Sequence, residues 1–128
     1  MEFNRDILDF DPAALTDQLV AFIRDQVQNN FHRKGIVIGL SGGIDSAVCA
    51  ALSVRALGKE RVFGVLLPEK DSNPVSREYG SKCAESLGIE YHEVEISPML
   101  EAFGVYAKRD SVVKKYFPEY DGDLKFRL

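Results

Sequence analysis

The sequence predicts an α/β fold with a doubly wound parallel sheet. Short apolar runs rich in β-branched residues alternate along the chain with amphipathic segments of roughly ten to fifteen residues, the pattern of successive βαβ units. With 128 residues, of which 45% are hydrophobic, the chain can bury one sizeable core but not two. We therefore expect a single domain over residues 1–128, with helices on both faces of the sheet.

The first half of the chain predicts a helix, a strand and a second helix. Asp11-Pro12 is an N-cap followed by proline at the first helical position, and apolar residues then recur at helical spacing through Val27. Residues 35–40 form a nearly continuous apolar run, typical of a central strand covered on both faces. The turn at residues 41–43 leads into a helix of small residues that stops at Gly58.

The middle of the chain repeats this order. Residues 62–67 predict a second buried strand, and Pro68 ends it because proline cannot donate to a sheet ladder. Asn73-Pro74 then begins a helix that closes at Gly88. Its predicted apolar stripe consists of Val75, Tyr79, Cys83 and Leu87.

The last third predicts an edge strand followed by helical segments. In residues 91–96 polar and apolar side chains alternate, which indicates a strand exposed to water on one side. Ser97 is expected to cap a helix that runs to about Tyr106. A short helical turn is expected from Asp110 or Ser111 to just before Pro118.

Composition excludes several classes of function. The chain carries 16 basic and 20 acidic side chains, a net charge of −4, which disfavours binding to nucleic acid. Its two cysteines form no CxxC motif, which argues against a zinc or redox site and favours a reducing cytoplasmic location. No run approaches the ~18 apolar residues that a membrane span requires.

The glycine-rich turn after the first strand predicts an anion site. Backbone N–H groups there lie at the positive end of the next helix, at the carboxyl edge of the sheet. Gly42 and Gly43 let a phosphate approach the main chain, and Ser41 and Ser46 offer hydroxyl groups. The turn has neither the lysine of a Walker loop nor the third glycine of a dinucleotide fingerprint.

Asp45 adds a negative charge to this predicted phosphate site. A carboxylate beside a phosphate is repelled unless a cation lies between them, which predicts a Mg²⁺ ion bridging Asp45 and phosphate oxygens. The alternative is that Asp45 and Ser46 cap the following helix. For Lys70, in the turn after the second strand, a nucleotide contact and a solvated surface position are both open, whereas Asp71, Ser72 and Asn73 are expected to cap a helix.

The sequence SGGIDS at residues 41–46 resembles the SGGxDS pyrophosphate loop of the N-type ATP pyrophosphatases. The resemblance implies a Rossmann-like nucleotide-binding domain of the adenine nucleotide alpha hydrolase type. It also implies that Asp45 holds Mg²⁺ and that Val65 and Leu67, at the end of the second strand, face adenine. The residues implied to cradle the β,γ-phosphates of ATP are Gly39, Leu40, Ser41, Gly42, Gly43, Ile44, Asp45 and Ser46.

Three further segments make the chain resemble the ammonia-dependent NAD synthetases: the helix before the first strand, residues 66–72 and residues 122–128. The last is similar to a GNxKARxR segment, which implies Lys125 and Arg127 near a deamido-NAD site, although Asp123 and Phe126 depart from that pattern. The family continues well beyond this length, so we expect the chain to be its N-terminal half, truncated at the C-terminus.

The resemblance implies an ATP-dependent amide ligase. Such an enzyme adenylates the nicotinate carboxylate of deamido-NAD and amidates it with ammonia, giving NAD, AMP and pyrophosphate without a side-chain nucleophile. It implies ATP and Mg²⁺ as cofactors, a homodimer, and ammonia that arrives free or from a separate glutaminase. Another adenylating amidase of the same superfamily and a non-catalytic ATP-binding module stay open as alternatives.

Overall fold

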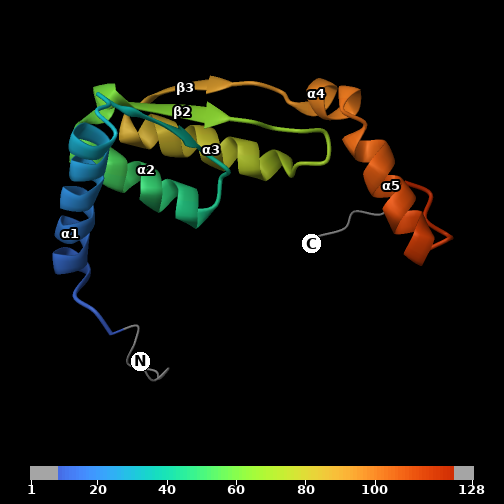
Figure 1. Ribbon diagram of the computed structural model, residues 1–128, viewed down its shortest axis with the longest axis horizontal. Coiled ribbons are helices and arrows are strands. Elements are labelled where there is room, and N and C mark those ends of the chain that lie inside the picture. The colour runs from blue at the N-terminus through green and yellow to red at the C-terminus, as the bar shows by residue number, and fades with distance from the viewer. Residues whose placement is uncertain (1–8, 123–128) are drawn as a thin grey trace.

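A parallel sheet of three strands forms the centre of the computed structural model, which describes residues 9–122 (Figure 1). The strands are β1 (Ile36–Gly39), β2 (Val62–Leu66) and β3 (Glu90–Glu93), and they lie in that order across the sheet. Ile36 pairs with Val62, and Phe63 pairs with Glu90, both in parallel register. The predicted α/β class with a parallel sheet is confirmed.

Two crossover helices cover one face of this sheet. Helix α2 (Ile44–Leu57), with the short 3₁₀ helix η3 (Lys59–Arg61), joins β1 to β2, and helix α3 (Pro74–Leu87) joins β2 to β3. Ala50 of α2 and Ala84 of α3 are fully buried against Val62 and Leu66 of β2. Small residues on both helices let them approach the sheet closely, which is why the core forms there.

Helix α1 (Pro12–Asp25) packs on α2 and continues into a π-helical turn, η2 (Gln26–Asn30). The predicted N-cap is confirmed, because an Asp11 carboxylate oxygen accepts hydrogen bonds from the Ala13 amide at 2.9 Å and the Ala14 amide at 3.3 Å. A second apolar cluster joins the two helices and consists of Val20, Val27, Ala56 and Leu57.

The second face of the sheet carries no helix among residues 9–122, and in Figure 1 both α2 and α3 lie on one side of the strands. Within the described residues the covering helices therefore lie on one face only, and cover of the second face stays a prediction. Val37, whose side chain points to the open face, is 70% exposed. Phe63 and Val65 of β2 lie on the same open face and are half-buried.

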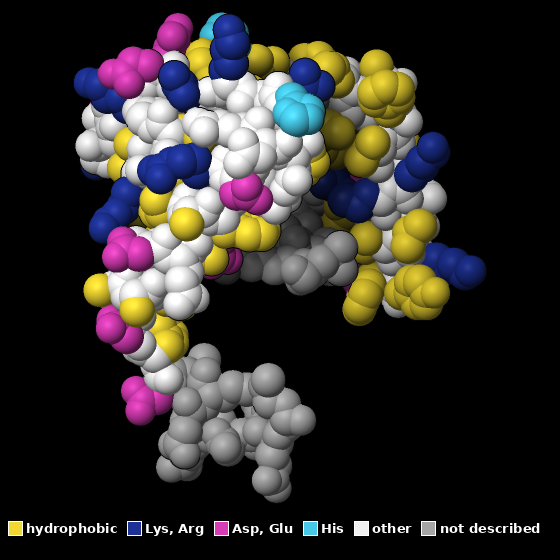
Figure 2. All heavy atoms as spheres, turned by 60° about the vertical axis from the view of Figure 1, so that its left-hand side comes forward, with side chains coloured by type: hydrophobic (Ala, Val, Ile, Leu, Met, Phe, Trp, Pro, Cys, Tyr) yellow, Lys and Arg dark blue, Asp and Glu magenta, His cyan; other side chains and the backbone are white. Residues whose placement is uncertain are grey.

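The last two helices form an arm that extends from the sheet. Helix α4 (Ser97–Ala102) ends at Phe103-Gly104, and α5 (Val105–Tyr116) follows as a continuous helix. The predicted boundary at Tyr106 is wrong because Gly104 has φ +67°, a left-handed conformation that stops a helix two residues earlier. The arm carries many exposed apolar side chains (Figure 2), including those of Met99, Phe103, Val112 and Phe117.

Ser97 has a different role from the one predicted. Its side chain does not cap α4, whose N-cap is Ile96. The Ser97 hydroxyl oxygen instead accepts a 2.7 Å hydrogen bond from the Lys70 amide and donates to Glu95. The capping prediction is confirmed for Asn73, whose Oδ1 accepts from the Val75 amide at 3.0 Å at the start of α3.

No helix in the described part of the chain is both long and apolar enough to cross a membrane.

Candidate functional site

The predicted phosphate loop lies at the carboxyl edge of the sheet, between the end of β1 and the start of α2. The Leu40 amide donates to the Val65 carbonyl at 2.9 Å, which prolongs the parallel ladder one residue past β1. Leu40 is buried in the core, so the loop begins from a fixed point. Ligands of open α/β sheets bind at this edge.

The two loop serines hold the turn in shape. The Ser46 hydroxyl donates to the Gly43 carbonyl at 2.9 Å and accepts from the Ser41 amide at 3.3 Å. The hydroxyls of Ser41 and Ser46 lie 3.1 Å apart, and the Ser41 hydroxyl accepts from the Gly43 amide at 3.2 Å. Both side chains therefore bond within the loop itself and stabilise a preformed conformation.

The two loop glycines are needed for different reasons. Gly42 has φ +78°, and a Cβ atom there would lie 2.2 Å from the Ser76 carbonyl oxygen of α3. The missing side chain of Gly42 thus lets α3 approach, a reason that the sequence did not reveal. A Cβ atom on Gly43 would meet only the Ser41 hydroxyl, at 3.3 Å, so the side of the loop at Gly43 is open.

The start of α2 offers backbone donors. Gly43 is the N-cap, and the first amide of the helical ladder that bonds back to it is that of Ala47, at 3.2 Å from the Gly43 carbonyl. The amides of Ile44, Asp45 and Ser46 precede this bond and belong to the four that a helix leaves without an internal acceptor. These amides and the helix dipole favour an anion at this point.

Asp45 lies in the first turn of α2 with an exposed side chain, and it makes no hydrogen bond or ion pair with residues 9–122. The alternative that Asp45 and Ser46 cap the helix is wrong, since the N-cap is Gly43 and neither side chain occupies it. Within residues 9–122 no three His, Cys, Asp or Glu side chains are grouped for a metal. Asp45 fits a Mg²⁺ ion that takes its other ligands from phosphate and water, as Mg²⁺ does at nucleotide sites.

A hollow of about 750 Å³ adjoins the loop on the side of β2. It brings together five of the predicted nucleotide residues: Gly39, Leu40, Ser41, Val65 and Leu67. The remaining predicted loop residues, 42–46, do not line it and lie beside it at the start of α2. Leu67 is 52% exposed, so it presents apolar surface at the mouth of the hollow.

The hollow also contains residues that the sequence did not single out. Arg77 of α3 lines it together with Glu93 of β3, and the Arg77 Nε donates to Glu93 Oε2 at 2.7 Å. Arg77 lies on a helix and Glu93 at the end of a strand, and only the pairing of β2 with β3 brings them together. Lys70, for which two roles were open, lies over the Tyr106 ring, with its Nζ 3.7 Å from the ring centroid.

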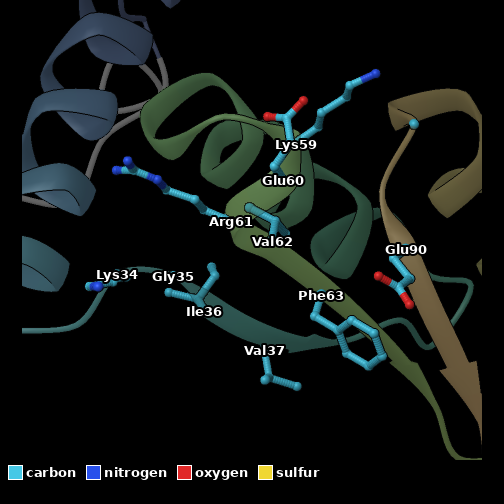
Figure 3. A pocket seen from close by; sticks show the side chains of 11 residues that line it. Lys34, Gly35, Ile36, Val37, Lys59, Glu60, Arg61, Val62, Phe63 and Glu90 are labelled. Carbon is cyan, nitrogen blue, oxygen red and sulfur yellow. The ribbon is translucent and has the colours of Figure 1, made fainter.

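A second hollow, of about 570 Å³, lies at the opposite, amino edge of the sheet (Figure 3). Apolar side chains such as Ile36 and Phe63 line it beside the cations of Lys34, Lys59 and Arg61. In Figure 3 the Lys59 side chain points away from Lys34 and Arg61, so the three charges do not converge on one point. The glycine loop belongs to the carboxyl edge, which makes the first hollow the candidate site.

Comparison with known proteins identifies the family of the chain. The NAD synthase family model matches residues 15–127. The chain belongs to the NAD synthase family. An NH(3)-dependent NAD(+) synthetase from Rhizobium rhizogenes is 44% identical over 117 residues, covering 91% of this chain and 35% of that protein.

Solved structures resemble this chain in fold as well as in sequence. An NMN synthetase from Francisella tularensis has a TM-score of 0.70 at 35% identity. The match covers 79% of this chain and 41% of that protein. A glutamine-dependent NAD+ synthetase from Acinetobacter baumannii, in complex with ADP, has a TM-score of 0.69 at 29% identity, covering 94% of this chain and 24% of that protein.

The chain thus spans about a third of the length of the curated NAD synthase relative reported above. Lys125 and Arg127, the residues predicted for the dinucleotide substrate, lie outside the described residues.

Proposed function

We propose that this chain supplies the ATP-binding part of an ammonia-dependent NAD synthetase. The observation that carries the proposal is that Ser41 of the SGGIDS loop and the end of β2 line one hollow at the carboxyl edge of the sheet, with the rest of the loop beside it at the start of α2. Membership of the NAD synthase family and the ADP complex of a structural neighbour support ATP as the nucleotide.

In this proposal the loop binds the β,γ-phosphates of ATP. The free amides at the start of α2 donate to phosphate oxygens, and the serine hydroxyls keep the loop in the conformation that presents those amides. Val65 and Leu67 contact the adenine ring from the end of β2, since both line the adjoining hollow. A bound Mg²⁺ would be held by Asp45 and would neutralise charge on the pyrophosphate leaving group.

The reaction proposed has two steps. An oxygen of the nicotinate carboxylate of deamido-NAD attacks the α-phosphorus of ATP, the bond to the β-phosphate oxygen breaks, and pyrophosphate leaves as the acyl-adenylate forms. Ammonia then attacks the acyl carbon, loses a proton and expels AMP, which leaves the amide of NAD. This chain contributes binding and orientation, and no side-chain nucleophile is needed.

A second candidate substrate comes from the comparison with the NMN synthetase. Because that neighbour is an NMN synthetase, the deamido form of NMN is a second candidate substrate. It carries a carboxylate that could accept the adenylyl group in the same chemistry. The departures at Asp123 and Phe126 from the expected dinucleotide segment also favour a test of both substrates. A homodimer, a cytoplasmic location and a separate glutaminase stay predictions.

Release of pyrophosphate tests the proposal. The chain is incubated with ATP, Mg²⁺ and ammonium, together with deamido-NAD, deamido-NMN or no carboxylate, and both AMP and pyrophosphate are measured. Turnover dependent on deamido-NAD supports the full function, and turnover with deamido-NMN alone assigns the smaller substrate. Saturable ATP binding without turnover supports a half-site, and the absence of ATP binding contradicts the proposal.

A further inference from the structure

The turn between β2 and α3 is fastened to the arm by three consecutive side chains. The Tyr106 hydroxyl donates to Glu69 Oε2 at 2.8 Å, and Lys70 Nζ lies 3.7 Å from the Tyr106 ring centroid. The Arg109 Nη1 donates to Asp71 Oδ2 at 2.5 Å. Tyr106 and Arg109 lie one helical turn apart on α5, so both meet the turn from the same helix face.

The same turn is a wall of the nucleotide hollow. Pro68, Glu69, Lys70 and Ser72 line that hollow together with Leu40 and Ser41 of the phosphate loop. The backbone of the turn is itself closed by two bonds, from the Ser72 amide to the Glu69 carbonyl at 2.9 Å and from the Glu69 amide to the Ser72 hydroxyl at 3.3 Å. The turn that α5 contacts is therefore also a wall of the hollow.

The contact between α5 and the turn is buried, and its charges are complementary. Tyr106 is only 8% exposed, burial raises the pKa of its phenol above the ordinary value, and its hydroxyl donates to Glu69. The hydrogen bond to Asp71 raises the pKa of Arg109, whose guanidinium also lies 5.3 Å from the Tyr106 ring centroid. Two cations thus flank one ring whose hydroxyl bonds a carboxylate.

The contact continues toward the end of the described chain. The Arg109 Nε donates to Asp110 Oδ1 at 2.9 Å, and the buried Tyr120 hydroxyl donates to the same oxygen at 3.1 Å. Asp71, Arg109, Asp110 and Tyr120 are therefore joined by direct hydrogen bonds.

We infer that Tyr106 and Arg109 are positioning residues that hold the Glu69–Ser72 turn as a wall of the nucleotide hollow. They act through the turn and need not touch the nucleotide. The functional part of this inference rests on the proposed ATP site, whereas the structural part stands on the contacts above. Neither residue was singled out from the sequence, because the expected helix boundary at Tyr106 separated the two.

Hydrogen exchange of the 128-residue chain without ligand tests the structural part. We expect Tyr106→Phe, which keeps the ring and loses the hydroxyl, to raise the exchange of the Lys70 and Ser72 amides about fivefold while β1 and β2 keep their protection. Tyr116→Phe is the matched control, since Tyr116 lies on the same helix, is 70% exposed and has no partner in residues 9–122. Unchanged exchange in Tyr106→Phe overturns the inference.

A second variant and a second readout separate positioning from general stability. Glu69→Gln weakens the same bond from the turn side, so its effect and that of Tyr106→Phe on turn exchange should be less than additive in the double variant. Additive effects, or a rise of exchange throughout the sheet, contradict a specific contact between the two side chains.

The affinity for Mg·ATP tests the functional part. Tyr106→Phe and Arg109→Gln should each raise the Kd about fivefold, with Tyr116→Phe unchanged. Raised turn exchange with an unchanged Kd overturns the positioning role. Absence of ATP binding in the unsubstituted chain instead refutes the proposed function, while the exchange comparison still decides whether Tyr106 and Arg109 fasten the turn.

Discussion

Gly42 shows how one residue can serve packing inside a predicted ligand loop. The sequence suggested that Gly42 and Gly43 are both small so that a phosphate can approach. The structure leaves room for such an approach only at Gly43, because the space beside Gly42 is already occupied by the Ser76 backbone of α3. A long-range contact of this kind leaves no local signal in the sequence, since Ser76 is brought to the loop by the β2–α3 connection.

Gly42→Ala should therefore destabilise the fold. The new Cβ would lie 2.2 Å from the Ser76 carbonyl oxygen, in addition to the strain of φ +78°, and we expect a loss of at least about 3 kcal/mol in the free energy of unfolding. Urea denaturation measures this. Gly104→Ala is the control, since φ at Gly104 is +67° but a Cβ atom there would have no neighbour within 4 Å. This variant should lower the free energy of unfolding by only about 1 kcal/mol. Equal losses in the two variants would exclude the close contact as the cause.

Asp45 is the residue whose role depends most on the metal. Its carboxylate has no protein partner in residues 9–122, so Asp45→Ala should leave the fold unchanged. We expect the variant to lose at least about tenfold in affinity for ATP with Mg²⁺ and little for ATP with EDTA, because a carboxylate beside metal-free phosphate only repels it. Calorimetric titration under both conditions provides the comparison, and equal losses would refute the metal role.

At the scale of elements, the caps of α1 and α3 were predicted correctly, whereas the cap predicted at Ser97 and the apolar stripe predicted for α3 were not fully right. Asp11 and Asn73 cap α1 and α3 as their residue types indicate. The apolar stripe predicted for α3 is only partly right, since Tyr79 is exposed and the buried positions are Gly80 and Ala84. Small residues mark the face that approaches the sheet closely, and a hydrophobicity pattern gives them little weight.

Helix α5 provides a prediction that depends on pH. The hydrogen bond from Arg109 lowers the pKa of Asp110 below its ordinary value. A carboxyl with a lowered folded-state pKa stabilises the fold above its unfolded pKa of about 3.9, and this stabilisation is lost as the pH falls through the folded pKa. Asp110→Asn should thus lower the thermal midpoint at pH 7, with the difference from the unsubstituted chain narrowing below about pH 4.

Thermal unfolding across this pH range measures the difference. Glu119→Gln controls for the loss of one negative charge, because Glu119 has no partner in residues 9–122. A midpoint difference for Asp110→Asn that stays constant from neutral to acid pH would show that the Arg109 bond does not depend on the ionised carboxyl.

At the scale of the whole molecule, the sequence predicted helices on both faces of the sheet. Residues 9–122 place them on one face. The parallel sheet, the crossover helices and the place of the SGGIDS loop all follow from local patterns and from the geometry of βαβ units. The second covering layer is not found in the described residues. The β1 pattern indicates two covered faces because Val37 is apolar, and the sequence alone does not say which part of a protein covers it.

The open face should make the chain associate with itself. Val37 is exposed on the outer strand β1, beside Phe63 of the central strand β2. An exposed apolar sheet surface at an outer strand favours pairing with another chain. We expect a sedimentation coefficient that rises with concentration, and Val37→Glu should remove the rise. Val112→Glu, at an exposed valine of the arm, is the control and should not. A concentration-independent monomer in the unsubstituted chain would contradict this prediction.

The central claim is that the SGGIDS loop binds the phosphates of ATP, and Gly43→Val tests it most directly. Gly43 has φ −86°, which any residue adopts, and a Cβ atom there would meet only the Ser41 hydroxyl, at 3.3 Å, which can turn aside, so the variant should stay folded by circular dichroism. Calorimetric titration with Mg·ATP should give saturable binding for the unsubstituted chain and a loss of at least about tenfold, or about 1.4 kcal/mol, for the variant. Equal affinity in the two folded proteins would show that ATP does not bind at the loop.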